Sequence, residues 1–135
     1  MSSLRKIFII EDENELLEIY RAIFKKEEFE VEEARFGEEA EREIEKWISG
    51  EKPKPDIVLL DLILPDINGV LLLKKIRENE NTRSIPVFVL TNYSSKEIET
   101  IVKQYGVEDY LVKTEIVPQN LLQKVKEVLK KHENS

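Results

Sequence analysis

The chain has 135 residues, the length of one ordinary domain, and its 28 acidic and 21 basic side chains give a formal net charge of −7. This balance argues against binding to a nucleic-acid backbone, and the lack of cysteine excludes disulfides and thiol catalysis. No run of about 18 apolar residues and no signal peptide is present, which favours a cytoplasmic protein without membrane insertion.

Five short apolar runs alternate with five amphipathic stretches along the chain. The apolar runs predict β-strands at residues 7–10, 29–34, 57–60, 87–90 and 110–112. Apolar residues at helical spacing predict helices at residues 16–24, 40–48, 72–76, 98–105 and 121–129. The first, third and fourth strands are continuously apolar, which is typical of parallel strands covered on both faces. Strict alternation therefore predicts an α/β domain with a parallel sheet and right-handed crossovers.

Polar side chains follow four of the five predicted strands. Glu11 and Asp12 come after the first strand, Asp61 after the third, Thr91 after the fourth and Lys113 after the fifth. Ligands of open α/β sheets bind beyond the carboxyl ends of the strands, so we expect these side chains to converge on one site. The chain contains few aspartates, which makes two of them at strand ends a strong signal.

The expected site has the composition of a phosphoryl-transfer centre. Three crowded carboxylates repel one another unless a cation lies among them, and oxygen ligands without His or Cys favour Mg²⁺ or Mn²⁺. A lysine and a threonine hydroxyl suit phosphoryl oxygens, whose transfer depends mainly on positioning and charge neutralisation. Because the single histidine, His132, lies near the chain end and cysteine is absent, Asp61 is the predicted nucleophile.

Competing phosphate-binding motifs are absent from the sequence. No G-x-x-x-x-G-K-[ST] or G-x-G-x-x-G pattern occurs, which excludes nucleotide binding by those loops. The signature of haloacid-dehalogenase-type phosphatases needs a second aspartate two residues after the nucleophile, where this chain has Ile63.

The motifs around these residues closely resemble the receiver domain of two-component response regulators, most of all the single-domain, chemotaxis-regulator-like type. The matching segments are residues 8–13, 59–66 with Gly69, 89–91 and 110–113. The resemblance covers about residues 4–131 and implies a flavodoxin-like, doubly wound (βα)5 fold. In that fold a five-stranded parallel sheet of order 2-1-3-4-5 carries helices on both faces. We interpret residues 1–135 as a single receiver domain.

The resemblance also implies a role for each strand-end residue. Asp61 would accept a phosphoryl group from a histidine kinase or a histidine phosphotransfer protein, in a reaction that depends on Mg²⁺ or Mn²⁺. The metal ligands would be Glu11, acting largely through water, together with Asp12, Asp61 and the backbone carbonyl of Ile63. Lys113 would contact the phosphoryl oxygens.

Thr91 and Tyr110 would transmit the phosphorylation signal. Thr91 would swing inward to hydrogen-bond the phosphoryl group, and Tyr110 would turn from an exposed to a buried rotamer. This shift would reshape the surface of the fourth helix, fifth strand and fifth helix. The protein would then be a phosphoacceptor that assists its own phosphorylation and dephosphorylation, not an enzyme. It would bind a downstream protein that the sequence does not name, without direct DNA binding, and whether activation produces a homodimer stays open.

The sequence departs from the family pattern at four positions. The family usually has Lys-Pro with a cis peptide bond after the last strand, whereas Lys113 is followed by Thr114. We predict that this bond is still cis, although a cis bond without proline costs about 3–4 kcal/mol. Asn92 stands directly after Thr91, where the family usually has a small residue. The larger side chain would narrow the path by which a phosphodonor reaches Asp61. Ile63 and Tyr93 would hinder the attacking water and give a long-lived phosphoryl-aspartate.

Two other classes of protein are alternatives. A degenerate receiver would act as a constitutive protein-binding module without phosphorylation, but the full acid set and Lys113 argue against it. A Mg²⁺-dependent phosphatase with an aspartyl intermediate lacks its second aspartate.

Overall fold

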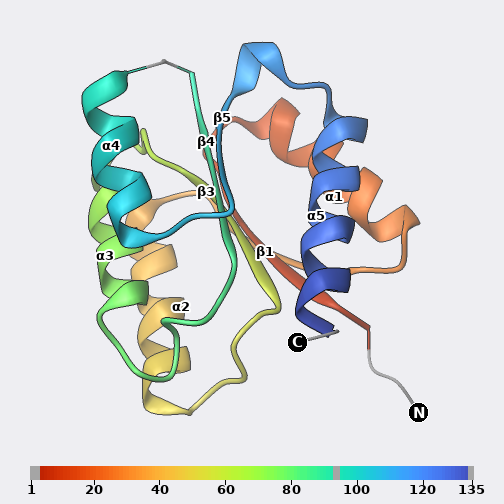
Figure 1. Cartoon of the computed structure of the whole chain (residues 1–135). Coiled ribbons are helices and arrows are strands. Elements are labelled where there is room, and N and C mark those ends of the chain that lie inside the picture. Colours follow the sequence, from red (N-terminus) through yellow and green to blue (C-terminus); the bar gives the residue numbers. More distant parts are fainter. Residues whose placement is uncertain (1–3, 93–94, 134–135) are drawn as a thin grey trace.

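The computed structural model describes residues 4–92 and 95–133, which form a five-stranded parallel sheet between two layers of helices (Figure 1). The strands are β1 Lys6–Ile10, β2 Glu30–Ala34, β3 Ile57–Asp61, β4 Val87–Thr91 and β5 Asp109–Val112. Their order across the sheet is β2-β1-β3-β4-β5, and every neighbouring pair is parallel. This order confirms the flavodoxin-like, doubly wound fold.

The helices divide between the two faces of the sheet. They are α1 Asn14–Lys26, α2 Gly37–Ser49, α3 Gly69–Arg77, α4 Lys96–Tyr105 and α5 Pro118–Glu133, with a short 3₁₀ helix at Lys113–Glu115. Helices α1 and α5 cover one face, and α2, α3 and α4 cover the other (Figure 1). This arrangement follows from the right-handed crossovers of parallel strands, and it leaves the carboxyl ends of the strands at one open edge.

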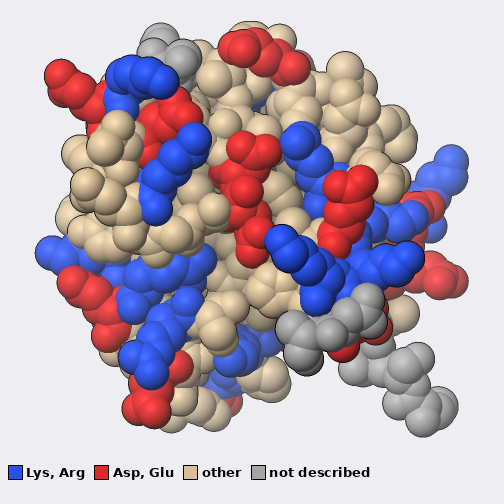
Figure 2. All heavy atoms as spheres, in the orientation of Figure 1, with Lys and Arg blue, Asp and Glu red and all other residues tan. Residues whose placement is uncertain are grey.

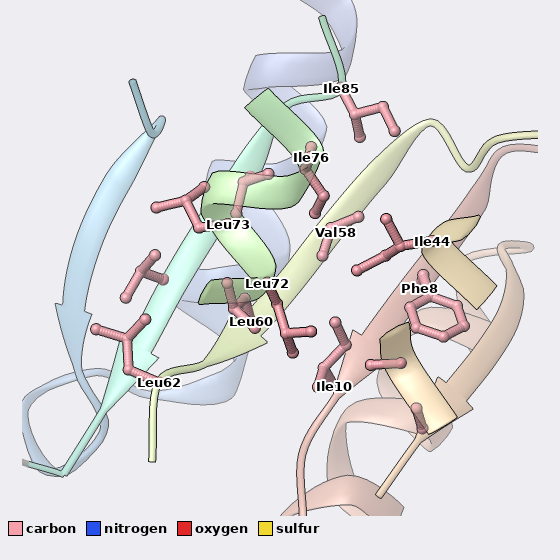
Figure 3. Close-up of a cluster of buried hydrophobic side chains, with 14 of the residues drawn as sticks. Phe8, Ile10, Ile44, Val58, Leu60, Leu62, Leu72, Leu73, Ile76 and Ile85 are labelled. Carbon is pink, nitrogen blue, oxygen red and sulfur yellow. The ribbon is translucent and has the colours of Figure 1, made fainter. Parts of the chain in front are cut away.

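The core consists of two apolar clusters, one on each side of the sheet. Successive side chains of a strand point to opposite faces, so Phe8 and Ile10 pack towards α2 and α3 while Ile7 and Ile9 pack towards α1 and α5. Figure 3 shows the first cluster, in which side chains of β1 and β3 meet those of α2 and α3. Trp47 of α2 packs edge-on against the ring of Phe8, with ring centroids 5.0 Å apart.

Many of the glutamates between residues 27 and 45 form ion pairs with lysine or arginine at or near the surface. Lys52 bridges Glu32 on β2 and Glu43 on α2, with Nζ 3.0 Å and 2.6 Å from their carboxylates. Acidic and basic side chains lie next to one another across the face drawn in Figure 2. None of the helices among residues 4–92 and 95–133 is long and apolar enough to cross a membrane.

Candidate functional site

The five polar residues predicted from strand ends lie together at the carboxyl edge of the sheet. Asp61 is the last residue of β3 and Thr91 the last of β4, whereas Glu11 and Asp12 directly follow β1 and Lys113 directly follows β5. Glu11, Asp61 and Thr91 are buried, and Asp12 is half-buried. Neighbouring parallel strands therefore bring residues far apart in the sequence into one polar site, as the sequence predicted.

Lys113 is the centre of this site. Its Nζ donates to Asp61 Oδ2 at 3.0 Å, Glu11 Oε2 at 2.9 Å and Glu13 Oε2 at 2.7 Å. The lysine side chain is only 4% exposed, so these charge-assisted bonds form away from bulk water and are stronger than surface contacts. One ammonium thus partly neutralises three carboxylates in the structure.

The remaining carboxylate oxygens are satisfied unevenly. Asp61 Oδ1 accepts from the backbone N–H of Ile63 at 3.0 Å, and Glu11 Oε2 accepts from that of Glu13 at 3.1 Å. Glu11 Oε1 lies 2.8 Å from Lys113 Nζ, yet this buried oxygen has no hydrogen-bond partner among the residues that the structure describes. A buried carboxylate oxygen of this kind has acceptor capacity left for a further ligand.

The carboxylates are arranged in a way that suits a divalent cation. Glu11, Asp12 and Asp61 each offer an oxygen atom, and these atoms all lie within 4.8 Å of one another. Hard cations such as Mg²⁺ and Mn²⁺ prefer oxygen ligands, and the unsatisfied Glu11 Oε1 belongs to the same group. The donor set therefore fits the cation that the sequence predicted.

Burial shifts the proton affinities of the site. Burial raises the pKa of Glu11 to about 7, although the hydrogen bond from Lys113 opposes this shift. Burial likewise raises the pKa of Asp61 against the nearby charge of Lys113. For Lys113, burial alone would lower the pKa, but hydrogen bonds to Glu11 and Glu13 outweigh it and raise the pKa above its ordinary range. Lys113 is thus held as a cation, whereas Glu11 titrates near neutral pH.

The loop between β3 and α3 depends on a close backbone approach. A Cβ atom at Gly69 would lie 2.6 Å from Leu62 Cα and 2.7 Å from the carbonyl oxygen of Asp61, so any larger residue would displace this loop. The N–H of Gly69 donates to the carbonyl oxygen of Leu62 at 2.8 Å, and Asn68 caps α3 by accepting from Val70 N at 2.9 Å. These contacts hold Ile63, whose carbonyl was predicted to bind metal, directly beside Asp61.

Thr91 and Tyr110 line one cavity beside the acidic cluster. The cavity measures about 540 Å³ and extends from the β3–α3 loop to the start of α4. Ile63 from the loop and Ile98 from α4 complete much of its wall. Tyr110 is half-buried, whereas Thr91 is buried.

The prediction of a cis peptide bond after Lys113 was wrong. All peptide bonds among residues 4–92 and 95–133 are trans, and the chain turns directly into the 3₁₀ helix Lys113–Glu115. Without proline the trans form is favoured by about 3–4 kcal/mol, and the long lysine side chain reaches the carboxylates along this path. Asn92 is exposed, and Tyr93, predicted to shield the site, lies outside the described residues.

Two residues of the site region were not recognised from the sequence. Glu13, the residue before α1, contacts Lys113, but the sequence pattern does not distinguish it from the surface glutamates of that helix. Asp66 follows Pro65 in a segment whose residues are typical of a turn, yet its carboxylate accepts from the backbone N–H groups of Gly37 and Glu38 at 2.7 Å and 2.9 Å. The role of Asp66 could have been inferred from the start of α2. The N-cap residue Phe36 has no side-chain acceptor, so the first backbone N–H groups of the helix need an acceptor from elsewhere in the chain.

The chain belongs to the response regulator receiver domain family, which it matches over residues 7–126. Receiver domains are the signalling modules of two-component systems, and the order of the five parallel strands described above is that of this class. The family assignment agrees with the resemblance found in the sequence.

Individual relatives support this assignment. The chain is 30% identical over 128 residues to the phosphate regulon transcriptional regulatory protein PhoB of Rhizobium meliloti, covering 95% of this chain and 53% of that protein. It thus spans about half the length of that curated relative. A CheY-like receiver domain protein from Methanospirillum hungatei matches with a TM-score of 0.83 and 30% identity over 98% of both chains. The phosphorylated cyanobacterial phytochrome response regulator RcpA matches with a TM-score of 0.78 and 26% identity, over 93% of this chain and 91% of that chain.

Proposed function

We propose that Asp61 is the phosphoacceptor of a two-component phosphorelay and receives its phosphoryl group from a histidine kinase or a histidine phosphotransfer protein. The observation that carries the proposal is the position of Asp61 at the carboxyl end of β3, with Lys113 Nζ 3.0 Å from Oδ2. A cation at this distance from a buried carboxylate can neutralise charge on a group transferred to it.

The transfer moves a phosphoryl group from the donor's imidazole to the Asp61 carboxylate. An oxygen of the Asp61 carboxylate forms a bond to phosphorus while the bond from phosphorus to the donor's imidazole nitrogen breaks, and the nitrogen keeps the electron pair. Lys113 stabilises the charge on the phosphoryl oxygens. Attack by water on phosphorus later releases inorganic phosphate and restores the carboxylate.

The acidic cluster would hold Mg²⁺, with Mn²⁺ as an alternative, through Glu11, Asp12, Asp61 and the carbonyl of Ile63. A bound divalent cation supplies positive charge that offsets the approach of an anionic phosphoryl group to several carboxylates. The unsatisfied buried oxygen Glu11 Oε1 supports this assignment.

Phosphorylation would be transmitted through Thr91 and Tyr110, which line the same cavity. A hydrogen bond from the Thr91 hydroxyl to the phosphoryl group would draw this side chain away from the cavity, and Tyr110 would turn into the released space. The surface of α4, β5 and α5 would change with it and bind a downstream protein. We place all of this in one receiver domain with its core at about residues 4–131, acting in the cytoplasm.

Phosphorylation by a small-molecule donor tests the proposal directly. The protein is incubated with acetyl phosphate and Mg²⁺, and its intact mass is measured. We expect one phosphoryl adduct in the wild type and in Asp109→Asn, a control at the start of β5, and none in Asp61→Asn. An unmodified wild type, with this donor and with histidine kinases, would favour the alternative of a constitutive binding module.

A further inference from the structure

Glu13 is a third carboxylate on the ammonium of Lys113, in addition to Glu11 and Asp61. Its Oε2 lies 2.7 Å from Lys113 Nζ, against 2.9 Å for Glu11 Oε2 and 3.0 Å for Asp61 Oδ2. It precedes the first residue of α1, so the chain path after β1 brings it over the site. Its contact is the shortest of the three hydrogen bonds that Lys113 donates.

These three hydrogen bonds occupy the full donor capacity of the lysine. An ammonium group has three N–H donors and no acceptor, and here each donor has one carboxylate partner. A phosphoryl group on Asp61 carries more negative charge than the carboxylate and offers more acceptor oxygens. For Lys113 to turn towards those oxygens, at least one of its present contacts must lengthen or break.

The three partners differ sharply in what their release would cost. The Glu11 side chain is 1% exposed, so losing the cation would leave its buried charge uncompensated, whereas Asp61 itself carries the phosphoryl group that Lys113 must reach. The Glu13 side chain is 48% exposed and can be hydrated as soon as it leaves the lysine. Its backbone would stay in place, because its N–H donates to Glu11 Oε2 and its carbonyl accepts from Leu17 N.

We propose that Glu13 is a displaceable counter-ion of Lys113, a positioning residue that holds the ammonium in the unphosphorylated protein and competes with the phosphoryl group for it. The inference rests on the proposed function and adds a residue that sets how strongly the site binds a phosphoryl group. Because only the unphosphorylated protein makes the contact, Glu13 lowers the affinity of the site for a phosphoryl group.

Beryllium fluoride, a stable stand-in for a phosphoryl group on a carboxylate, provides the test. Its affinity is measured for the full chain at saturating Mg²⁺ by isothermal titration calorimetry. We expect Glu13→Gln to bind it about fivefold more tightly than the wild type, the size expected for loss of a partly exposed ion pair. The matched control is Glu15→Gln, which removes the same charge from the second residue of α1, where Glu15 lines the same hollow beside Lys113. We expect it to change the affinity by less than about twofold.

A charge-conserving variant distinguishes the effect of the Glu13–Lys113 contact from the effect of the negative charge alone. Glu13→Asp keeps the negative charge but is one methylene shorter, so it loses the contact with Lys113 and is expected to tighten binding in the same direction as Glu13→Gln. An independent readout needs neither metal nor phosphoryl analogue: the ¹⁵N-detected proton exchange of the Lys113 ammonium. We expect this exchange to be faster in Glu13→Gln and Glu13→Asp than in Glu15→Gln.

The outcomes distinguish the inference from the function on which it rests. If the wild type binds beryllium fluoride but Glu13→Gln binds it no more tightly than Glu15→Gln, the counter-ion role of Glu13 is wrong and the phosphoacceptor function stands. If neither the wild type nor any variant binds the analogue at the Asp61 site, the proposed function is wrong. The proposed competition between Glu13 and the phosphoryl group for Lys113 is then wrong as well.

Discussion

Lys113 Nζ and Asp61 Oδ2 lie 3.0 Å apart, although 52 positions separate the two residues in the chain. Their side chains are 4% and 3% exposed. Strand β4 lies between β3, which ends at Asp61, and β5, which Lys113 directly follows, so the contact forms only when these three strands are in register. The Lys113–Asp61 pair therefore depends on the correct pairing of β3, β4 and β5.

Removing the charge of Lys113 should destabilise the protein strongly. Lys113→Met keeps the length of the side chain but leaves buried carboxylates without their cation, and we expect the free energy of unfolding to fall by about 3 kcal/mol in metal-free buffer. Urea unfolding at pH 8 with a chelator measures this. Lys124→Met, which breaks the exposed pair with Asp109, should cost less than about 1 kcal/mol. Equal losses in the two variants would disprove the special role of the buried cation.

The raised pKa of Glu11 predicts that stability declines as pH rises through the acidic range. The unfolded chain has the ordinary pKa of 4.5 and the folded protein about 7, so the folded state binds more protons between these values. In metal-free buffer the free energy of unfolding should therefore fall from about pH 4.5 to pH 7. Glu11→Gln should flatten this dependence and be more stable than the wild type at pH 8 by about 2 kcal/mol.

Urea titrations at several pH values in the presence of a chelator provide the measurement. The exposed variant Glu18→Gln on α1 serves as the control and should follow the wild-type profile. A Glu11→Gln protein with the same pH profile as the wild type would show that Glu11 does not carry the effect.

Mg²⁺ should stabilise the folded protein through the acidic cluster. A ligand that binds only the folded state at a hundred times its Kd adds about 2.7 kcal/mol, which thermal unfolding detects as a higher Tm. We expect this increase in the wild type and in Asp109→Asn, its loss on addition of EDTA, and little increase in Asp12→Asn. Retention of the full increase in Asp12→Asn would place the metal elsewhere.

The Asp66 carboxylate should stabilise the start of α2. It accepts from Gly37 N and Glu38 N, and these backbone bonds, led by the one from Glu38, lower the pKa of Asp66. Because the folded pKa lies below the unfolded one, this contribution is present at neutral pH and is lost as pH falls into the acid range. Asp66→Ala should lower the Tm at pH 7 by more than the exposed control Glu80→Ala, with a smaller difference at pH 3.

Ile63 should prolong the life of the phosphoryl-aspartate. Its side chain is 49% exposed beside Asp61 and offers no polar group that could orient an attacking water. Ile63→Asn is expected to shorten the half-life of the isolated phosphoprotein about tenfold, a difference of about 1.4 kcal/mol in activation free energy. Loss of the phosphoryl adduct over time is followed by intact mass, with Leu71→Asn on exposed α3 as the control. A half-life of seconds in the wild type would contradict the prediction.

Local sequence patterns predicted much of the fold. Apolar runs such as 57–60 and 87–90 became buried central strands, because strands covered by helices on both faces need apolar residues at every position. The polar residues that end those runs lie together as expected, since the carboxyl ends of parallel strands meet at one edge of the sheet. The sequence pattern was weaker at β2, where only Ala34 is buried and the other residues are exposed or half-buried.

Contacts between distant segments could not be predicted in the same way. Asp66 has the sequence features of a turn residue, and nothing within a few positions of it reveals that it caps α2. The bond after Lys113 was predicted cis from family resemblance, but the local chain without proline follows a trans path into a 3₁₀ turn.

The sequence by itself therefore determined the elements, the residues at the strand ends and the chemical character of the site, because these depend on periodicity and composition. Only the tertiary structure decided that Lys113 is shared by Glu11, Glu13 and Asp61 and that burial brings the pKa of Glu11 to about 7. Charge pairing and desolvation depend on distances between side chains that are remote in the sequence, and packing of the whole sheet sets those distances.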